Sequence, residues 1–191
     1  KDYTLPAQTD AWGLSNLLFN DDGDYITFEG TVSTAPDQIA IMPGYLQKEW
    51  EANGRKYYTY KMNDELDFFY NISSANYKVV KDVWKGKSGE KVNIEIYHHP
   101  THTYNVDRFI KSVKHSMDYY SENYGSYQYT QMRILEFPRY QDFAQSFPNT
   151  VPFAESFAWV GDFSDPNDLD YVFTVTAHEV AHQWWGHQIT P

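Results

Sequence analysis

The residues best suited to chemistry form the segment HEVAH, from His178 to His182. On a helix, residues four apart lie on the same face, so both imidazoles can reach one metal ion. Glu179 lies about 100° further round the helix, where its carboxylate can reach a water on that metal. The spacing predicts a zinc site with His178 and His182 as ligands and Glu179 as the general base.

A working zinc hydrolase also needs a third protein ligand and an open position for water. His187 is the only other histidine close by, but on a continuing helix it lies about 140° from His182 and points away from the metal. We expect His187 to be a solvent-facing or helix-end residue. An alternative interpretation is that His178 and His182 are hydrogen-bonded core residues without a metal, because the three fixed positions of HExxH also arise by chance.

Composition excludes several classes of protein. The 191 residues are 41% hydrophobic and 18% aromatic, which is enough to build a folded core. The formal net charge of -11 argues against nucleic acid as a partner, because phosphate-binding surfaces need clustered Lys and Arg. There is no cysteine, so thiolate ligands are excluded. No apolar run is long enough for a transmembrane helix, and we expect no membrane contact by this segment itself.

The first half of the chain reads as short strands separated by turns. Asn53-Gly54 and Ser88-Gly89 are typical hairpin turns. The acidic segment at residues 20–24 lacks the spacing of a calcium loop and predicts a solvated hairpin turn. Alternating or apolar runs predict strands over residues 25–29, 38–42, 56–62, 67–72, 77–85 and 91–97.

Three histidines, His98, His99 and His102, surround Pro100 where the pattern changes. Such a group can bind a metal, but a proline-broken surface loop of histidines more often marks a boundary. We therefore predict a β domain over residues 1–100 and a second domain over residues 101–191.

Helical periodicity predicts a helix between the N-cap Asn105 and Gly125, and alternation predicts a strand over Gln131–Phe137. Extended pieces follow at 143–147 and 151–160. Prolines in this region predict an irregular sheet edge, with which a bound peptide could pair.

The last helix is predicted to begin at the N-cap Asp165, with Pro166 in its first turn. It is apolar on most sides, which predicts a buried helix. Its predicted core stripe consists of Leu169, Phe173, Ala177, Val180 and Trp184.

The segment AHEVAHQWWGHQIT resembles the zinc-binding helix of the aminopeptidase N-like family of gluzincin metallopeptidases, in which HExxH is followed by Gln, aromatic residues and Gly. Residues 152–156 are similar in position to the family's Gly-any-Met-Glu-Asn strand, whose glutamate holds the free amino terminus of the substrate. Only that glutamate, Glu155, is kept. The resemblance implies an α+β fold, in which a mostly antiparallel, saddle-like β domain precedes the first part of a thermolysin-like catalytic domain.

The resemblance implies a zinc-dependent metallopeptidase, an aminopeptidase that removes N-terminal residues from a peptide substrate by attack of a zinc-activated water. In the family the third zinc ligand is a glutamate that would fall beyond Pro191, as would a tyrosine that stabilises the oxyanion. We therefore expect a fragment of a longer enzyme that is inactive by itself and binds zinc weakly.

Another function remains open, a non-catalytic peptidase-like interaction module of a larger protein. Segments of this type are similar to peptidase-like regions fused to permease-like membrane spans in some bacterial proteins. That likeness implies an extracytoplasmic position and a membrane-anchored parent chain. The sequence does not define an oligomeric state.

Overall fold

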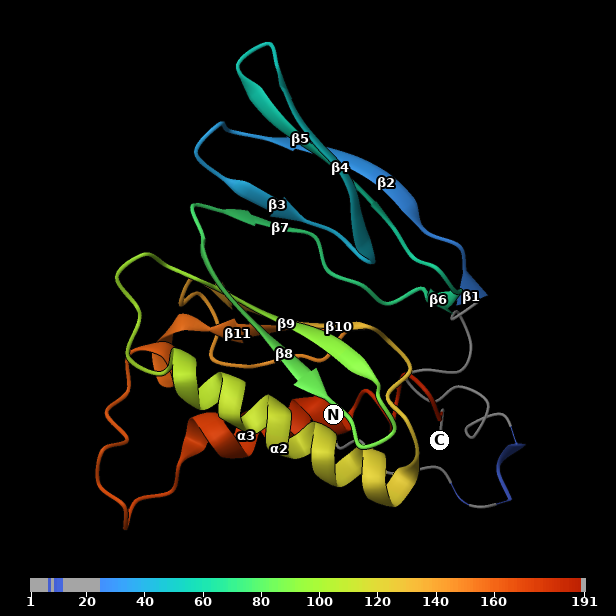
Figure 1. The fold of residues 1–191 in the computed structure, drawn as a ribbon, viewed down its shortest axis with the longest axis vertical. Coiled ribbons are helices and arrows are strands. Elements are labelled where there is room, and N and C mark those ends of the chain that lie inside the picture. The colour runs from blue at the N-terminus through green and yellow to red at the C-terminus, as the bar shows by residue number, and fades with distance from the viewer. Residues whose placement is uncertain (1–6, 8, 12–24, 190–191) are drawn as a thin grey trace.

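The structure is a computed structural model that describes residue 7, residues 9–11 and residues 25–189 (Figure 1). It has the predicted α+β fold, in which a layer of antiparallel strands lies over a mixed sheet, and two helices cover the other face of that sheet. The hairpin turn predicted at residues 20–24 lies outside the described residues. In the described part of the chain, no helix is long and apolar enough to cross a membrane.

The first layer contains a three-stranded antiparallel sheet in the order β2-β5-β4. Its strands are β2 (Glu29–Thr34), β4 (Tyr45–Ala52) and β5 (Arg55–Lys61). Asn53 and Gly54 join β4 to β5 with φ angles of 51° and 71°, the left-handed geometry that the Asn-Gly pair predicts. No sequence pattern predicts β4, because it is largely polar and exposed. Its pairing with β5 makes it a strand.

Two short antiparallel pairs complete this layer. They are β1 (Tyr25–Ile26) with β6 (Leu66–Asp67), and β3 (Ile39–Ile41) with β7 (Ser73–Ala75). The strands predicted over 25–29 and 67–72 are wrong in extent, because the chain leaves the strand conformation at 27–28 and 68–72. Burial of Tyr58 and Tyr60 against Ala40 and Met42 forms a small core here.

The second layer is a four-stranded sheet in the order β8-β9-β10-β11. Its strands are β8 (Lys78–Lys85), β9 (Lys91–His98), β10 (Gln131–Phe137) and β11 (Thr150–Ala154). β8 and β9 are antiparallel, whereas β9, β10 and β11 are parallel, and β10 is buried along its whole length. Strands from both sides of residue 100 share this sheet. The domain boundary at that residue stays a prediction.

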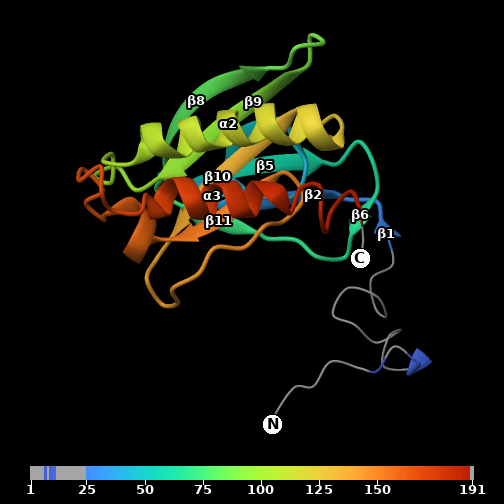
Figure 2. The ribbon, with the colours of Figure 1, turned by 90° about the horizontal axis from the view of Figure 1, so that it is seen from below.

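The helices α2 (Val106–Tyr124) and α3 (Tyr171–Ala181) lie side by side against this sheet (Figure 2). α2 is the crossover that the parallel strands β9 and β10 require. Asn105 precedes α2 as predicted, but its side chain does not cap the helix. Its Nδ2 instead donates to the carbonyls of Ala158 and Gly161, at 2.8 and 3.0 Å.

Residues 143–147 form the irregular edge that the prolines predict. They are not a continuous strand, but Ala154 N donates to Phe143 O at 2.9 Å, and Phe147 N donates to Thr150 O at 2.8 Å. The extended segment predicted over 151–160 is wrong beyond Ala154, because Glu155–Trp159 form a π-helical turn, η1. A peptide approaching this edge would meet residues 143–147 instead of β11.

The helix α3 begins later than predicted. Its N-cap is Asp170 instead of Asp165, and Asp170 Oδ1 accepts a hydrogen bond from Phe173 N at 2.9 Å. Leu169 precedes the helix and is 57% exposed, so its place in the predicted core stripe is wrong. The buried residues of α3 are Val172, Thr176, Glu179 and Val180.

Replacement of Asp170 with alanine should lower the free energy of unfolding by about 1–2 kcal/mol, because it removes the N-cap and the ion pair with Arg108. Asp165→Ala is the matched control, since Asp165 lies before the helix, and its effect should stay within about 0.5 kcal/mol. Urea denaturation of both variants measures the difference. Equal losses would contradict the assignment of the N-cap to Asp170.

Candidate metal centre

The two histidines of HEVAH converge at the C-terminal end of α3. The Nε2 atoms of His178 and His182 are 3.1 Å apart, and the ring planes make an angle of 88°. His178 is exposed and His182 is half-buried, so this face of the helix is open. Both nitrogens are therefore accessible to an ion from solvent. The other faces of α3 are buried or half-buried, as its apolar pattern predicts.

A backbone carbonyl orients the second histidine. His182 Nδ1 lies 3.1 Å from Trp185 O, and because a carbonyl only accepts hydrogen bonds, Nδ1 carries the proton. The lone pair of His182 is then on Nε2, facing His178. Partial desolvation against the helix surface, and secondarily the neighbouring His182, lowers the pKa of the largely exposed His178, which favours the neutral imidazole that a metal requires.

The spacing of the histidine pair fits zinc. Zn–N bonds of about 2.0–2.1 Å at a tetrahedral angle place two nitrogens about 3.3 Å apart, close to the 3.1 Å found here. Both rings can therefore bind one ion with little movement. Among the described residues, the one group of three or more His, Cys, Asp or Glu ligands within mutual reach lies elsewhere and includes neither histidine.

Glu179 lies next to His178, and its carboxylate is suited to accept a proton. It is only 6% exposed. Burial raises the pKa of its carboxyl group, although His182 and the backbone of Ser146 partly offset that effect. A carboxylate whose pKa is raised toward neutrality is a better general base.

Gln183 attaches the irregular edge to the end of α3. Its fully buried side chain donates from Nε2 to Ser146 Oγ at 2.6 Å and to Phe147 O at 2.9 Å. Its Oε1 accepts from Asn149 N at 2.8 Å. These bonds hold residues 143–149 beside the helix that carries the histidines. The sequence marks Gln183 only as the residue after HEVAH, because its partners lie far upstream.

His187 lies just past the end of α3, as one of the two predicted alternatives has it, but the other alternative, that it faces solvent, is wrong. Its Nε2 lies 3.2 Å from Ser146 O, and its buried Nδ1 has no hydrogen-bond partner among the described residues. Burial lowers the pKa of His187 to about 4, so the imidazole is neutral near pH 7 and Nε2 donates to the Ser146 carbonyl. His187 is thus a second anchor of residues 143–147.

The contacts of Glu155 are with residues other than the histidine pair. Gln183 binds Asn149, just before β11, whereas Glu155 follows the other end of that strand. Glu155 instead accepts from Arg139 N at 3.2 Å and lies 3.9 Å from His102 Nε2. In the described part of the chain, no hydrogen bond or ion pair links it to HEVAH.

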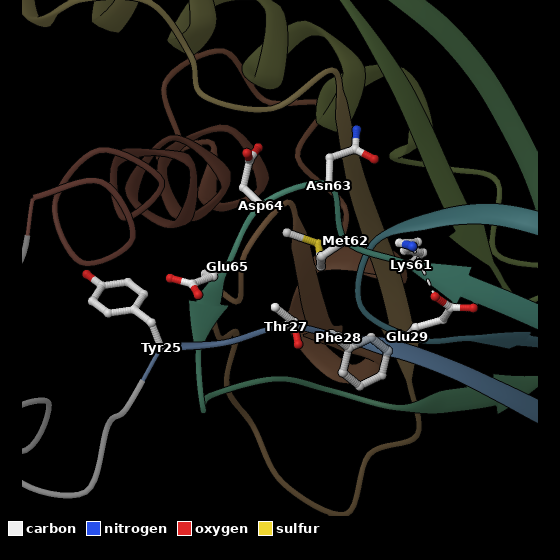
Figure 3. Close-up of a pocket in the computed structure, with 9 residues that line it drawn as sticks. All are labelled: Tyr25, Thr27, Phe28, Glu29, Lys61, Met62, Asn63, Asp64 and Glu65. Carbon is white, nitrogen blue, oxygen red and sulfur yellow. Dashed lines mark ion pairs between the residues drawn. The ribbon is translucent and has the colours of Figure 1, made fainter.

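A cavity of about 820 Å³ lies in the β region (Figure 3). It lies between the beginning of β2 and the loop after β5, and its lining includes the ion pair between Glu29 and Lys61 at 3.1 Å. None of the predicted site residues lines this cavity. Its acidic side chains Asp64 and Glu65 belong to no group of converging metal ligands among the described residues.

The fold is similar to those of solved zinc metallopeptidases. Aminopeptidase A of Legionella pneumophila, in complex with aspartic acid, matches with a TM-score of 0.77 and 19% identity, over 95% of this chain and 22% of that chain. The M1 zinc metallopeptidase of Deinococcus radiodurans matches with a TM-score of 0.66 and 16% identity, over 87% of this chain and 36% of that chain. A mutant of a two-domain M1 zinc metallopeptidase bound to L-arginine matches with a TM-score of 0.65 and 15% identity, with the same coverage.

No family model and no curated protein sequence matches the chain significantly. At identities of 15–19%, the structural matches show a shared fold. The chain therefore has the fold of part of an M1 zinc metallopeptidase, and it spans 22% of the Legionella protein and 36% of the Deinococcus protein.

Proposed function

We propose that this chain carries the metal-binding helix and the general base of a zinc-dependent peptidase. The observation that supports it best is the 3.1 Å separation of the Nε2 atoms of His178 and His182, next to the buried Glu179. The more specific proposal is an aminopeptidase. One of the similar structures is an aminopeptidase with aspartic acid and another holds L-arginine, so by analogy the substrate here is a peptide with a free amino terminus.

Three residues at the C-terminal end of α3 would have separate roles in the reaction. His178 and His182 would hold zinc through Nε2, with the ring of His182 oriented by the Trp185 carbonyl. When bound, zinc lowers the pKa of a coordinated water toward neutrality and polarises a carbonyl group. Glu179 accepts a proton on its carboxylate and passes it to the amine that leaves as the peptide bond breaks.

Residues 143–147 are the proposed binding edge for the peptide. Their inner side is hydrogen-bonded to β11, and Gln183 and His187 hold them beside α3. An extended peptide can add to a free edge through main-chain hydrogen bonds. The Ser146 carbonyl is already bonded to His187, so the peptide would pair with the outer side of the residues before Ser146.

Binding of the peptide's amino terminus by Glu155 stays a prediction. Its carboxylate is 36% exposed and so is open to a ligand. Its neighbours, however, are His102 and Arg139, and it follows the end of β11 farther from the Gln183 contact.

The test is hydrolysis of a short peptide by the full-length protein before and after removal of metal. A chelator should abolish hydrolysis and added zinc should restore it, because the two histidines act only through the ion. An N-acetylated peptide should resist cleavage if the enzyme is an aminopeptidase. Hydrolysis that survives chelation contradicts the proposal, and no hydrolysis by the zinc-loaded protein favours the interaction module.

A further inference from the structure

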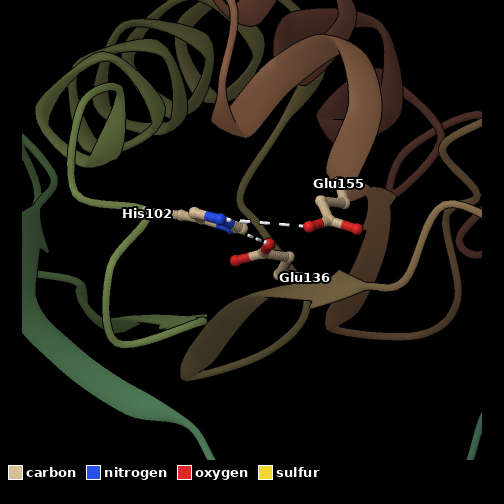
Figure 4. Close-up of side chains that lie close together, drawn as sticks. All are labelled: His102, Glu136 and Glu155. Atoms are coloured by element: carbon tan, nitrogen blue, oxygen red, sulfur yellow. Dashed lines mark hydrogen bonds and ion pairs between the residues drawn. The ribbon is translucent and has the colours of Figure 1, made fainter.

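A second group of metal-binding side chains lies outside HEVAH (Figure 4). His102 follows β9, Glu136 lies near the end of β10, and Glu155 begins η1. One potential ligand atom from each residue lies within 4.8 Å of the others. The predicted surface loop of histidines is therefore wrong in part, because His98 is 2% exposed and His102 points toward the two carboxylates.

Glu136 orients the imidazole of His102. This glutamate is 6% exposed, and it accepts hydrogen bonds from His99 N at 2.6 Å and from His102 Nδ1 at 2.5 Å. Because the carboxylate is the acceptor, the proton of a neutral His102 is on Nδ1 and the lone pair is on Nε2. Histidines that bind metals typically donate their other N–H to a carboxylate in this way.

The lone pair of His102 faces a second carboxylate across a gap. Glu155 Oε1 is 3.9 Å from His102 Nε2, which is too long for a hydrogen bond. Two acceptors that face each other repel unless a cation lies between them. Metal–ligand bonds of about 2.0–2.2 Å at a tetrahedral angle need a separation of about 3.4 Å. The half-exposed Glu155 side chain can close that difference with a small rotation.

In the part of the chain that the structure describes, no Lys or Arg side chain neutralises the negative charge of Glu136 and Glu155. Arg139 touches Glu155 only through its backbone N–H, and its guanidinium lies 3.7 Å from Asp142. In the described part of the chain, no Lys or Arg forms an ion pair with Glu136 or Glu155. A cavity of about 120 Å³ that both glutamates line gives water access to their side, as a partly hydrated ion requires.

We propose that His102 and Glu155 bind a divalent cation of the zinc type, with Glu136 holding the imidazole in place, at a site separate from His178 and His182. The imidazole nitrogen favours zinc over magnesium or calcium, which prefer all-oxygen sites. This inference does not depend on the peptidase proposal.

The test measures zinc binding in a variant that lacks the histidine pair His178 and His182. In the His178→Ala, His182→Ala double variant, isothermal titration with zinc chloride should detect one equivalent. Adding Glu155→Gln, which preserves the shape of the side chain, should weaken the affinity at least ~10-fold, and His102→Asn should do the same. Glu122→Gln and His115→Asn, which alter exposed residues of α2, are the matched controls and should leave the affinity unchanged.

The proposal is overturned if the double variant binds no zinc, or if the controls weaken binding as much as Glu155→Gln and His102→Asn do. The competing occupant of the gap is a proton, which makes His102 an imidazolium between two carboxylates. In that case ¹⁵N NMR shows both ring nitrogens of His102 protonated after zinc is added, which also overturns the proposal.

The same Glu155→Gln substitution, made in the full-length protein, separates the metal site from amine binding. A metal role predicts weaker zinc binding, whatever the effect on the KM for an unblocked peptide. Higher KM with unchanged zinc binding would overturn the metal role and support binding of the peptide's amino terminus. Circular dichroism of each variant checks that the fold is retained.

Discussion

Glu179→Gln in the full-length protein should lower the rate of peptide hydrolysis by at least ~100-fold while zinc stays bound. Glutamine has nearly the same size and keeps an accepting oxygen, but it cannot take up a proton. Zinc should be retained because His178 and His182 hold it and Glu179 is not one of its proposed ligands. Steady-state kinetics and elemental analysis of the same preparation measure the two quantities.

The control for this prediction is Glu122→Gln, the same chemical change at an exposed glutamate that pairs with Lys87 on the surface. It should leave both the rate and the zinc content unchanged. Undiminished turnover by Glu179→Gln would exclude Glu179 as the general base. Loss of zinc together with activity would instead make Glu179 part of the metal site.

Gln183→Leu should destabilise the fold by about 2–4 kcal/mol, because buried polar groups lose their hydrogen-bond partners. Leucine fills a similar volume but cannot pair with Asn149 N, Ser146 Oγ or Phe147 O. The main cost is the buried N–H of Asn149. The free energy of unfolding from urea titration measures the effect, and a raised KM for peptide substrates would show that the binding edge has also moved.

Gln128→Leu is the matched control for Gln183→Leu. Gln128 is exposed, and its one hydrogen bond goes from Nε2 to Gln183 O at 3.1 Å. Its replacement should change stability by no more than about 0.5 kcal/mol. Equal losses in the free energy of unfolding for the two variants would contradict the view that the hydrogen bonds of Gln183 hold residues 143–149 against α3.

Local patterns predicted the elements whose structure depends on nearby residues. β10 has the bounds expected from its alternation, and α2 runs from Val106 to Tyr124 as its apolar periodicity indicates. The convergence of His178 and His182 follows from the four-residue spacing on a helix, so sequence was sufficient to place the two nitrogens together.

Features that depend on distant partners could not be predicted in this way. β4 is a strand because of its pairing with β5, and α3 starts at Asp170 because this aspartate caps Phe173 and meets Arg108 of another helix. The sequence around Glu136 indicates only a strand, because its contact with His102 forms between residues that are distant in the sequence. The pattern of histidines was visible in the sequence, but their carboxylate partners were not.

The most direct test of the central claim is a zinc titration of peptide hydrolysis by metal-free, full-length protein. The proposed function predicts no hydrolysis without zinc, and a rate that rises with the zinc bound. His178→Ala should stay inactive at every zinc concentration, whereas His115→Ala, which removes an exposed histidine of α2, should follow the wild type. Hydrolysis by the zinc-free protein, or by the zinc-loaded His178→Ala variant, would contradict the claim.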